Sequence, residues 1–149
     1  MKQSRLFGTD GIRGVAGEYP LDERTVFIIG QALGEFLRRR RLSPRVLLGE
    51  DTRESSHWMA ETLAAGLAGE QVTAISAGVI PTPGVAYLSR AGRFSAGVMI
   101  SASHNAYRDN GIKVFAHSGF KLPDESELEL EEAIFRRAEG SPGAPSRPA

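Results

Sequence analysis

Short apolar runs alternate along this chain of 149 residues with segments whose apolar residues recur at helical spacing. The clearest helical segment covers residues 22–40, where Val26 and Leu33 fall on one face and Asp22 is suited to the N-cap. A short apolar run at residues 45–49 follows and has the length of a buried strand. Because strands that alternate with helices pack in layers, the chain is expected to form an α/β domain around a largely parallel sheet.

The same patterns predict further helices and strands. Helices are expected where apolar spacing or a start signal occurs: residues 55–68, a segment opened by Pro81-Thr82-Pro83, and residues 124–138, with Asp124 and Glu127 as a capping box. Strands are expected at residues 71–76, 94–100 and 112–115. The glutamates of the last helix are expected to form a solvated face: Glu125, Glu127, Glu129, Glu131 and Glu132. Residues 140–149 are rich in Gly, Pro and Ser, which predicts a disordered tail after one domain at residues 1–139.

Composition narrows the classes of function. The chain has no cysteine, which excludes disulfides, thiolate catalysis and cysteine-based zinc sites. Its formal net charge is zero, and the four arginines at residues 38–41 sit where cations complement a helix dipole, so nucleic acid is not an expected partner. Residues 1–14 lack the apolar core of a signal peptide and no apolar run reaches the length of a membrane span, so we expect a cytoplasmic protein without a membrane partner.

One loop carries the residue types most suited to chemistry. The apolar run 96–100 leads into Ser101-Ala102-Ser103-His104-Asn105, and Asn110-Gly111, a turn signal, precedes Lys113. The Gly-x-Ser-x-Gly elbow of many serine hydrolases is missing. Phosphoryl transfer depends instead on positioning and positive charge, which a loop serine near Lys113 and an arginine would supply. The alternative is a loop that only caps and turns the chain.

The start of the chain holds a second unusual run at residues 7–14. Its glycines allow tight or left-handed backbone, and Arg13 between Ile12 and Gly14 would present a forked guanidinium to a phosphate group. A flexible turn with a surface arginine is the alternative. No P-loop or Gly-x-Gly-x-x-Gly fingerprint occurs, which disfavours nucleotide binding, and the aspartates are too scattered to form a divalent-metal cage.

Several short motifs together resemble the first domain of the α-D-phosphohexomutase family in the same order. They are residues 7–14, Asp51-Thr52-Arg53, Pro81-Thr82-Pro83, residues 100–105 and residues 109–113. The resemblance extends from about residue 7 to about residue 138 and implies a three-layer α/β/α sandwich with a mixed, largely parallel sheet. The Gly-Thr-Asp-Gly-Ile-Arg-Gly start and the Ser-Ala-Ser-His-Asn loop favour the branch that acts on glucosamine phosphates over the phosphomannomutase branch.

The resemblance also implies roles for individual residues. Ser103 matches the family's phosphoserine, which would donate its phosphoryl group to glucosamine 6-phosphate, regain one from the bisphosphate intermediate and release glucosamine 1-phosphate. The phosphate on Ser103 would also ligate Mg²⁺. Lys113 matches a lysine near the phosphoserine that is suited to acid–base work or charge neutralisation, and Arg13 matches an arginine beside the cleft. His104 and Asn105 would shape the loop and contact substrate or phosphate.

Two departures limit what the resemblance implies. Ala106 stands where the family loop usually has proline, which leaves the backbone freer at that point. Family members have four domains, and their aspartate-rich Mg²⁺ loop, sugar-recognition loop and substrate-phosphate site lie in the later ones. The chain alone is therefore expected to fold without being a working mutase, its catalytic partners being the missing domains. The alternatives are a non-catalytic phosphosugar-binding or interaction module, or another phosphohexomutase (phosphomannomutase or phosphoglucomutase).

Overall fold

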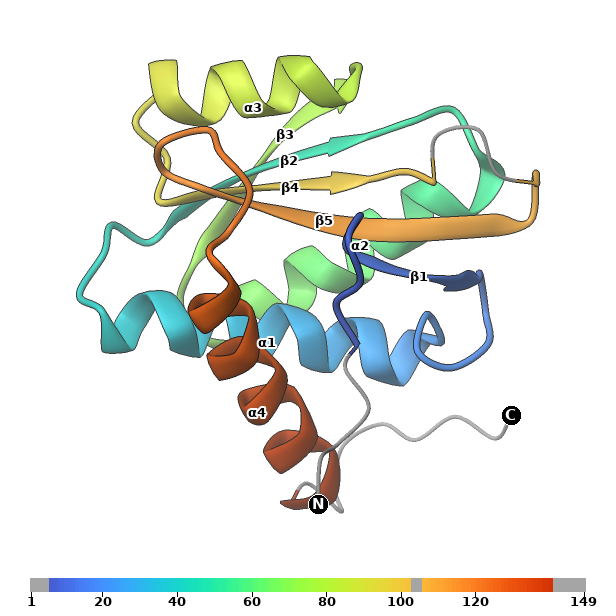
Figure 1. The fold of residues 1–149 in the computed structure, drawn as a ribbon, viewed down its shortest axis with the longest axis horizontal. Helices are drawn as coiled ribbons and strands as arrows, with labels where there is room; N and C mark the ends of the chain where they lie inside the picture. Colours follow the sequence, from blue (N-terminus) through green and yellow to red (C-terminus); the bar gives the residue numbers. More distant parts are fainter. Residues whose placement is uncertain (1–5, 103–105, 141–149) are drawn as a thin grey trace.

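The computed structural model describes residues 6–102 and 106–140. Its strands form one sheet in the order β1-β5-β4-β2-β3 (Figure 1). The strands are β1 (Ile12–Val15), β2 (Arg45–Glu50), β3 (Thr73–Val79), β4 (Ala96–Ile100) and β5 (Asp109–Ala116). The helices are α1 (Glu23–Arg39), α2 (Glu54–Gly69), α3 (Thr82–Ala91) and α4 (Asp124–Gly140).

The sheet is mixed, and all but one of its strands run in the same direction. Strand β2 pairs in parallel with β3 and β4, whereas β5 is antiparallel to both β4 and β1. Because β1 opposes β5, it runs with the other three. Helix α3 covers one face of the sheet, and α1, α2 and α4 cover the other (Figure 1). The predicted three-layer α/β/α sandwich with a mixed, largely parallel sheet is confirmed.

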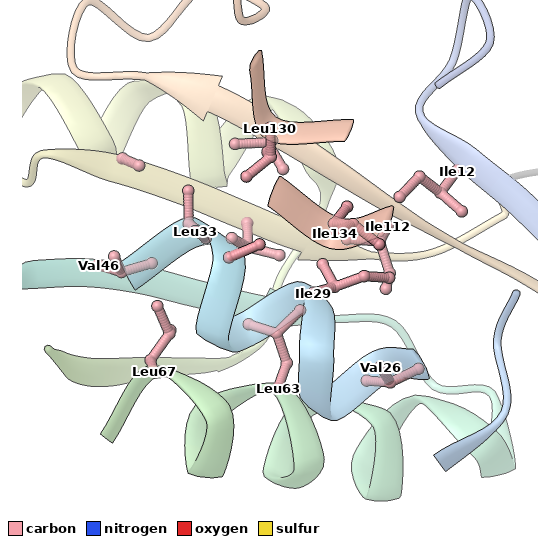
Figure 2. Packing of buried hydrophobic residues seen from close by; sticks show 14 of the residues in the cluster. Ile12, Val26, Ile29, Leu33, Val46, Leu63, Leu67, Ile112, Leu130 and Ile134 are labelled. Carbon is pink, nitrogen blue, oxygen red and sulfur yellow. The ribbon is translucent and has the colours of Figure 1, made fainter. Parts of the chain in front are cut away.

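Most of the apolar side chains are buried between the sheet and the helix layer of α1, α2 and α4. Figure 2 shows Leu33 of α1, Leu67 of α2 and Leu130 of α4 pointing into one cluster with Val46 and Ile112 of the sheet. A second, smaller cluster lies under α3 and consists of Leu47, Val85, Phe94 and Met99. Successive side chains of a strand point to opposite faces, so β2 supplies both clusters. Each buried side chain of this size stabilises the fold by about 1.5–3 kcal/mol.

The predicted helices are confirmed, with Asp22 as the N-cap of α1, but the strands at the β1 edge differ from expectation. The side chain of Asp22 accepts a hydrogen bond from the Thr25 amide at 3.2 Å. Strand β1 was not predicted, because its arginine and glycine hide the alternation that marks a strand. Asn110-Gly111, expected as a turn, lies inside β5, where Gly111 pairs with Arg13 of β1. Pairing with two neighbouring strands overrides the local turn preference.

The expectation of a solvated glutamate face on α4 is wrong for two of its members. Glu127 and Glu131 are only 3% and 4% exposed. Lys121 Nζ lies 3.0 Å from a carboxylate oxygen of Glu127, and the Phe7 amide donates to Glu131 at 2.8 Å. Of the two residues predicted to form a capping box, Asp124 is the first residue of α4 and Glu127 faces Lys121. Buried carboxylates are tolerated here because each meets a cation or an amide.

A buried glutamate fastens α4 to α1. Glu35 of α1 lies 2.8 Å from both Arg136 and Arg137 of α4, and 3.2 Å from Arg39 one turn along its own helix. Burial alone would raise the pKa of Glu35, but the hydrogen bonds and charges of Arg136 and Arg137 outweigh it and hold the pKa below its ordinary value. The carboxylate is therefore stabilised in its charged form.

Replacement of Glu35 by glutamine keeps the side-chain shape and removes the shared charge. We expect the free energy of unfolding to fall by about 2 kcal/mol at neutral pH, less than for a fully buried pair because Arg39 and Arg136 remain exposed. Since the folded-state pKa is lowered, the stabilisation by the charge is present above the ordinary value of 4.5 and is lost as the pH falls through the folded-state pKa.

Urea unfolding of the wild type and of Glu35→Gln at about pH 7 and about pH 3 measures this difference. Glu125→Gln, a change at an exposed position of α4, is the control and should leave the free energy of unfolding unchanged at both pH values. An equal loss for Glu35→Gln at both pH values would show that the charge is not what fastens α4.

Helices α1 and α2 cross with their backbones in contact. A Cβ atom at Gly30 would overlap the carbonyl oxygen of Leu63, and one at Gly66 would overlap that of Phe27 and lie 2.9 Å from the Gln31 amide nitrogen. Neither obstacle is a side chain that could rotate away. The closeness of the two helices therefore depends on glycine at both positions.

Alanine at Gly66 is expected to lower the free energy of unfolding by about 1–3 kcal/mol, because the helices must separate to admit the methyl group. Alanine at Gly69 provides a matched control on the same helix, since a Cβ there meets nothing within 4 Å. That change should raise stability by about 0.5 kcal/mol through the backbone entropy of glycine. Thermal unfolding of both variants measures the two effects. If the Gly66→Ala protein were as stable as the Gly69→Ala protein, the backbones of α1 and α2 would not be in contact at Gly66.

Candidate functional site

Arg13 and Gly111 lie directly opposite each other in the β1–β5 pair. Opposed residues point to the same face of an antiparallel pair, and a Cβ at Gly111 would lie 3.0 Å from Arg13 Cδ. The stem of Arg13 therefore runs across the bare backbone of Gly111. Within the described residues, the Nε atom of Arg13 is buried without a hydrogen-bond partner.

Lys113 shares that face of the sheet. Its neighbours Ile112 and Val114 belong to the cluster under α1, so the alternation of β5 directs Lys113 to the opposite side. It lies two positions after Gly111, the partner of Arg13, which places the two cationic side chains near each other along the same strand pair. Among the described residues, neither Arg13 nor Lys113 forms an ion pair.

The glycine-rich start folds back against Lys113 as a tight turn. The Gly8 amide donates to the Gly11 carbonyl at 2.9 Å, and Gly11 has a φ of +88°, which strongly favours glycine. A Cβ at Gly11 would lie 3.1 Å from Lys113 Cγ. Thr9, Asp10 and Gly11 thus line a small cavity of about 210 Å³ with Lys113.

The carboxyl ends of β2 and β4 lie side by side at one end of the sheet, because the two strands are parallel neighbours. Glu50 pairs with Ile100, and the Asp51 amide donates to the Ile100 carbonyl at 3.1 Å. The turn that begins at Asp51 therefore lies beside Ser101, the first residue after β4. Ser101 and Ala102 are both buried.

Asp51 is the centre of a polar cluster at this edge. Its carboxylate accepts from the Arg53 amide at 3.0 Å and from Arg53 Nη1 at 2.7 Å, and it also accepts from the Ser56 hydroxyl. Burial alone would raise the pKa of Asp51, but hydrogen bonds from Ser56, Arg53 and Ser101 hold it below the ordinary value. Asp51 is therefore a charged acceptor within this cluster.

Sequence reasoning missed Ser56 and Asn110, which are fully buried polar residues. Asn110 Nδ2 donates to Ser55 Oγ at 2.7 Å and to Ser56 Oγ at 3.0 Å, and its Oδ1 accepts from the Gly111 amide at 2.8 Å. Local sequence contains no signal for these contacts, since they join positions more than fifty residues apart. Only the tertiary fold, which brings the start of α2 next to Asn110 at the start of β5, places them together.

Three predicted site residues, Ser103, His104 and Asn105, lie outside the described residues, as do residues 141–149 of the predicted tail, whereas Gly140, its first residue, is the last residue of α4. The structure describes the chain on both sides of this triplet. Ala102 is buried before it, and the carbonyl of Ala106 after it accepts from the Asp109 amide at 3.0 Å. Arg13 and Lys113 are thus brought to one face, while the roles of the triplet stay predictions.

The described residues do not by themselves fit a magnesium ion. Within residues 6–102 and 106–140, no group of three or more His, Asp or Glu side chains could hold a metal. The basic run at the end of α1 is used internally: Arg38 pairs with Glu70, Arg39 with Glu35, and Arg40 with Glu129. In the same described part of the chain, no helix is long and apolar enough to cross a bilayer.

Comparison with known proteins decides the family. The family pattern described as "Phosphoglucomutase/phosphomannomutase, alpha/beta/alpha domain I" matches residues 4–141. The chain belongs to this family. Its sequence is 61% identical over 140 residues to a phosphoglucosamine mutase of Solibacter usitatus, covering 94% of this chain and 31% of that protein. A phosphoglucosamine mutase of Deinococcus deserti is 53% identical over 134 residues, covering 90% and 30%.

Solved structures agree with the assignment of the fold. A crystal structure of a putative phosphomannomutase from Thermus thermophilus superposes with a TM-score of 0.79 at 30% identity, covering 90% of this chain and 30% of that one. A phosphoglucomutase/phosphomannomutase family protein from Burkholderia thailandensis gives a TM-score of 0.76 at 26% identity, covering 89% and 30%. The chain therefore spans slightly less than a third of the length of the relatives it matches.

Proposed function

We propose that this chain is the phosphoserine-bearing first domain of a phosphoglucosamine mutase. The observation that carries the proposal is that the sheet register brings Arg13 and Lys113 to one face, close to the strand end that leads into Ser103. Neither cation has an ionic partner among the described residues, so an anion is the ligand they suit. The names of the most similar relatives supply the substrate class.

In the proposed reaction, Ser103 carries a phosphoryl group on its hydroxyl oxygen. The 1-hydroxyl oxygen of glucosamine 6-phosphate attacks that phosphorus, the bond to the Ser103 oxygen breaks, the proton of the attacking hydroxyl passes to that oxygen, and glucosamine 1,6-bisphosphate forms. The Ser103 oxygen then attacks the 6-phosphate of the bisphosphate, its proton passes to the departing 6-oxygen, and glucosamine 1-phosphate is released. The phosphoserine is restored, so no phosphoryl donor is consumed.

The roles of the surrounding residues follow from their charge and position. Phosphoryl transfer spreads negative charge over the transferred oxygens, which Arg13 and Lys113 would stabilise. The guanidinium of Arg13 offers a planar pair of donors, and Lys113 offers a point charge that could also exchange a proton. His104 and Asn105 are proposed to shape the loop and contact substrate or phosphate.

Magnesium is proposed to bind through the phosphate on Ser103, with its other ligands supplied by parts of a full-length relative that this chain does not cover. The described residues alone provide no such cage. Substrate recognition is proposed to lie in those other parts as well, as the family resemblance implies. We therefore expect the isolated chain to bind glucosamine 6-phosphate very weakly and not to turn it over.

A chimera tests the proposal, with residues 1–140 of this chain replacing the matching segment of the Solibacter usitatus relative, to which it is 61% identical. The chimera should convert glucosamine 6-phosphate to glucosamine 1-phosphate, and mass spectrometry should find one phosphate on the peptide containing Ser103. Ser103→Ala should remove that phosphate and lower turnover on the order of a thousandfold or more. Lys113→Met should lower kcat by about a hundredfold.

Ser118→Ala is the matched control, since Ser118 lies in a turn after β5 and its hydroxyl oxygen accepts from the Phe120 amide at 3.2 Å. Its turnover should equal that of the unmodified chimera. An active chimera whose turnover survives Ser103→Ala would overturn the proposed carrier. Tight binding of glucosamine 6-phosphate to the isolated chain by calorimetry would favour a binding module instead.

A further inference from the structure

The strand ends on either side of residues 103–105 are tied to a third element, the turn between β2 and α2. The chain leaves the sheet at Ile100 and enters it again at Asp109. Each end is linked through a polar side chain to the same carboxylate, that of Asp51. Pairing of the strands does not require this arrangement, because β4 already pairs over its whole length with residues 112–116 of β5.

At the β4 end, the link is made by Ser101. Its side chain hydrogen-bonds to the carboxylate of Asp51, and its amide donates to the Gly111 carbonyl at 3.0 Å. The Asp51 amide in turn donates to the Ile100 carbonyl. Ser101 is therefore held both to the neighbouring strand and to the turn after β2.

At the β5 end, the link runs through Ser56. The hydroxyl of Ser56 donates its single proton to Asp51 Oδ1. The hydroxyl oxygen of Ser56 can therefore act only as an acceptor toward Asn110, and it accepts from Asn110 Nδ2 at 3.0 Å. The carbonyl oxygen of the Asn110 side chain fixes the Gly111 amide. A chain of hydrogen bonds thus passes from β5 through α2 to Asp51.

Burial makes this chain of contacts rigid. Ser56 and Asn110 are 0% exposed, so each broken hydrogen bond would leave a buried polar atom without water. The four residues satisfy one another, and Arg53 balances the charge of Asp51. Fully satisfied buried networks of this kind favour a single arrangement of the backbone that carries them.

We propose that Asp51, Ser56, Ser101 and Asn110 form a clamp that positions the strand ends flanking residues 103–105 for phosphoryl transfer, with Ser56 as its bridge. The inference rests on the proposed function. These are positioning residues, because they act through the backbone at Ser101 and Gly111. They hold the backbone at Ser101 and Gly111 beside the face that carries Arg13 and Lys113.

Neighbouring serines provide a matched pair of variants. Ser56→Ala removes the bridge, whereas Ser55→Ala removes only an outer partner of Asn110 and leaves the path to Asp51 intact. In the 149-residue chain, Ser56→Ala should accelerate hydrogen exchange of the Ser101 and Gly111 amides about tenfold relative to the core amide of Leu33. Ser55→Ala should change this ratio by less than about twofold.

The chimera described above supplies the functional readout. Ser56→Ala should lower kcat about tenfold and leave KM within about twofold, because positioning affects the transfer step more than substrate binding. Unchanged exchange ratios in Ser56→Ala would overturn the clamp. Faster exchange with an unchanged kcat would overturn its role in transfer.

The two proposals fail in different ways. If the unmodified chimera is active but carries no phosphate on Ser103, the proposed carrier is wrong, and with it the role of the clamp in transfer. The exchange experiment uses no substrate, so it still decides whether Ser56 joins the strand ends. Hydrogen exchange can thus confirm the clamp even if Ser103 carries no phosphate. Mass spectrometry can likewise confirm the phosphate on Ser103 even if hydrogen exchange shows no clamp.

Discussion

The register of β5 between two antiparallel neighbours is the constraint on which the site depends. Ile112 and Val114 are buried in the cluster under α1, and this burial fixes the face on which Lys113 emerges. A slip of one residue would turn Lys113 into the apolar layer and expose both neighbours. The same register sets Gly111 opposite Arg13. Hydrophobic packing on one face of the sheet thus determines the arrangement of charge on the other.

Charged side chains form ion pairs inside this domain as well as on its surface. The chain has 18 basic and 18 acidic side chains, and several of them join helices to one another or to loops. Glu35 forms ion pairs with three arginines, and Glu127 forms one with Lys121. Glu131 accepts a hydrogen bond from a backbone amide. Several other arginines, among them Arg45, Arg90 and Arg108, also lack an ion pair within the described residues. Arg13 and Lys113 differ from these in sharing one face of the sheet beside the end of β4, and this shared position is the physical basis for proposing a ligand there.

Much of the layered architecture could be predicted from periodicity, because the helices are amphipathic and the central strands are short apolar runs. Strand β1 could not, since an arginine and a glycine interrupt its alternation and its pairing partner is about a hundred residues away. The burial of Glu127 and Glu131 was hidden for a similar reason, because a glutamate-rich helix has the same local pattern whether or not Lys121 and Phe7 lie against it. Arg13 and Lys113 were identifiable as candidates, but their common face required the register. The roles of Ser103, His104 and Asn105 remain predictions.

The crossing of α1 and α2 has a consequence for how this sequence can drift. Where two side chains compete for space, a larger residue on one helix can be offset by a smaller one on the other. At Gly30 and Gly66 the obstacle is a carbonyl group of the opposite backbone, which no substitution makes smaller. The two positions therefore cannot compensate for each other, and each is restricted independently. In this layer, the apolar positions around the crossing can be substituted, whereas the two glycines at its centre cannot.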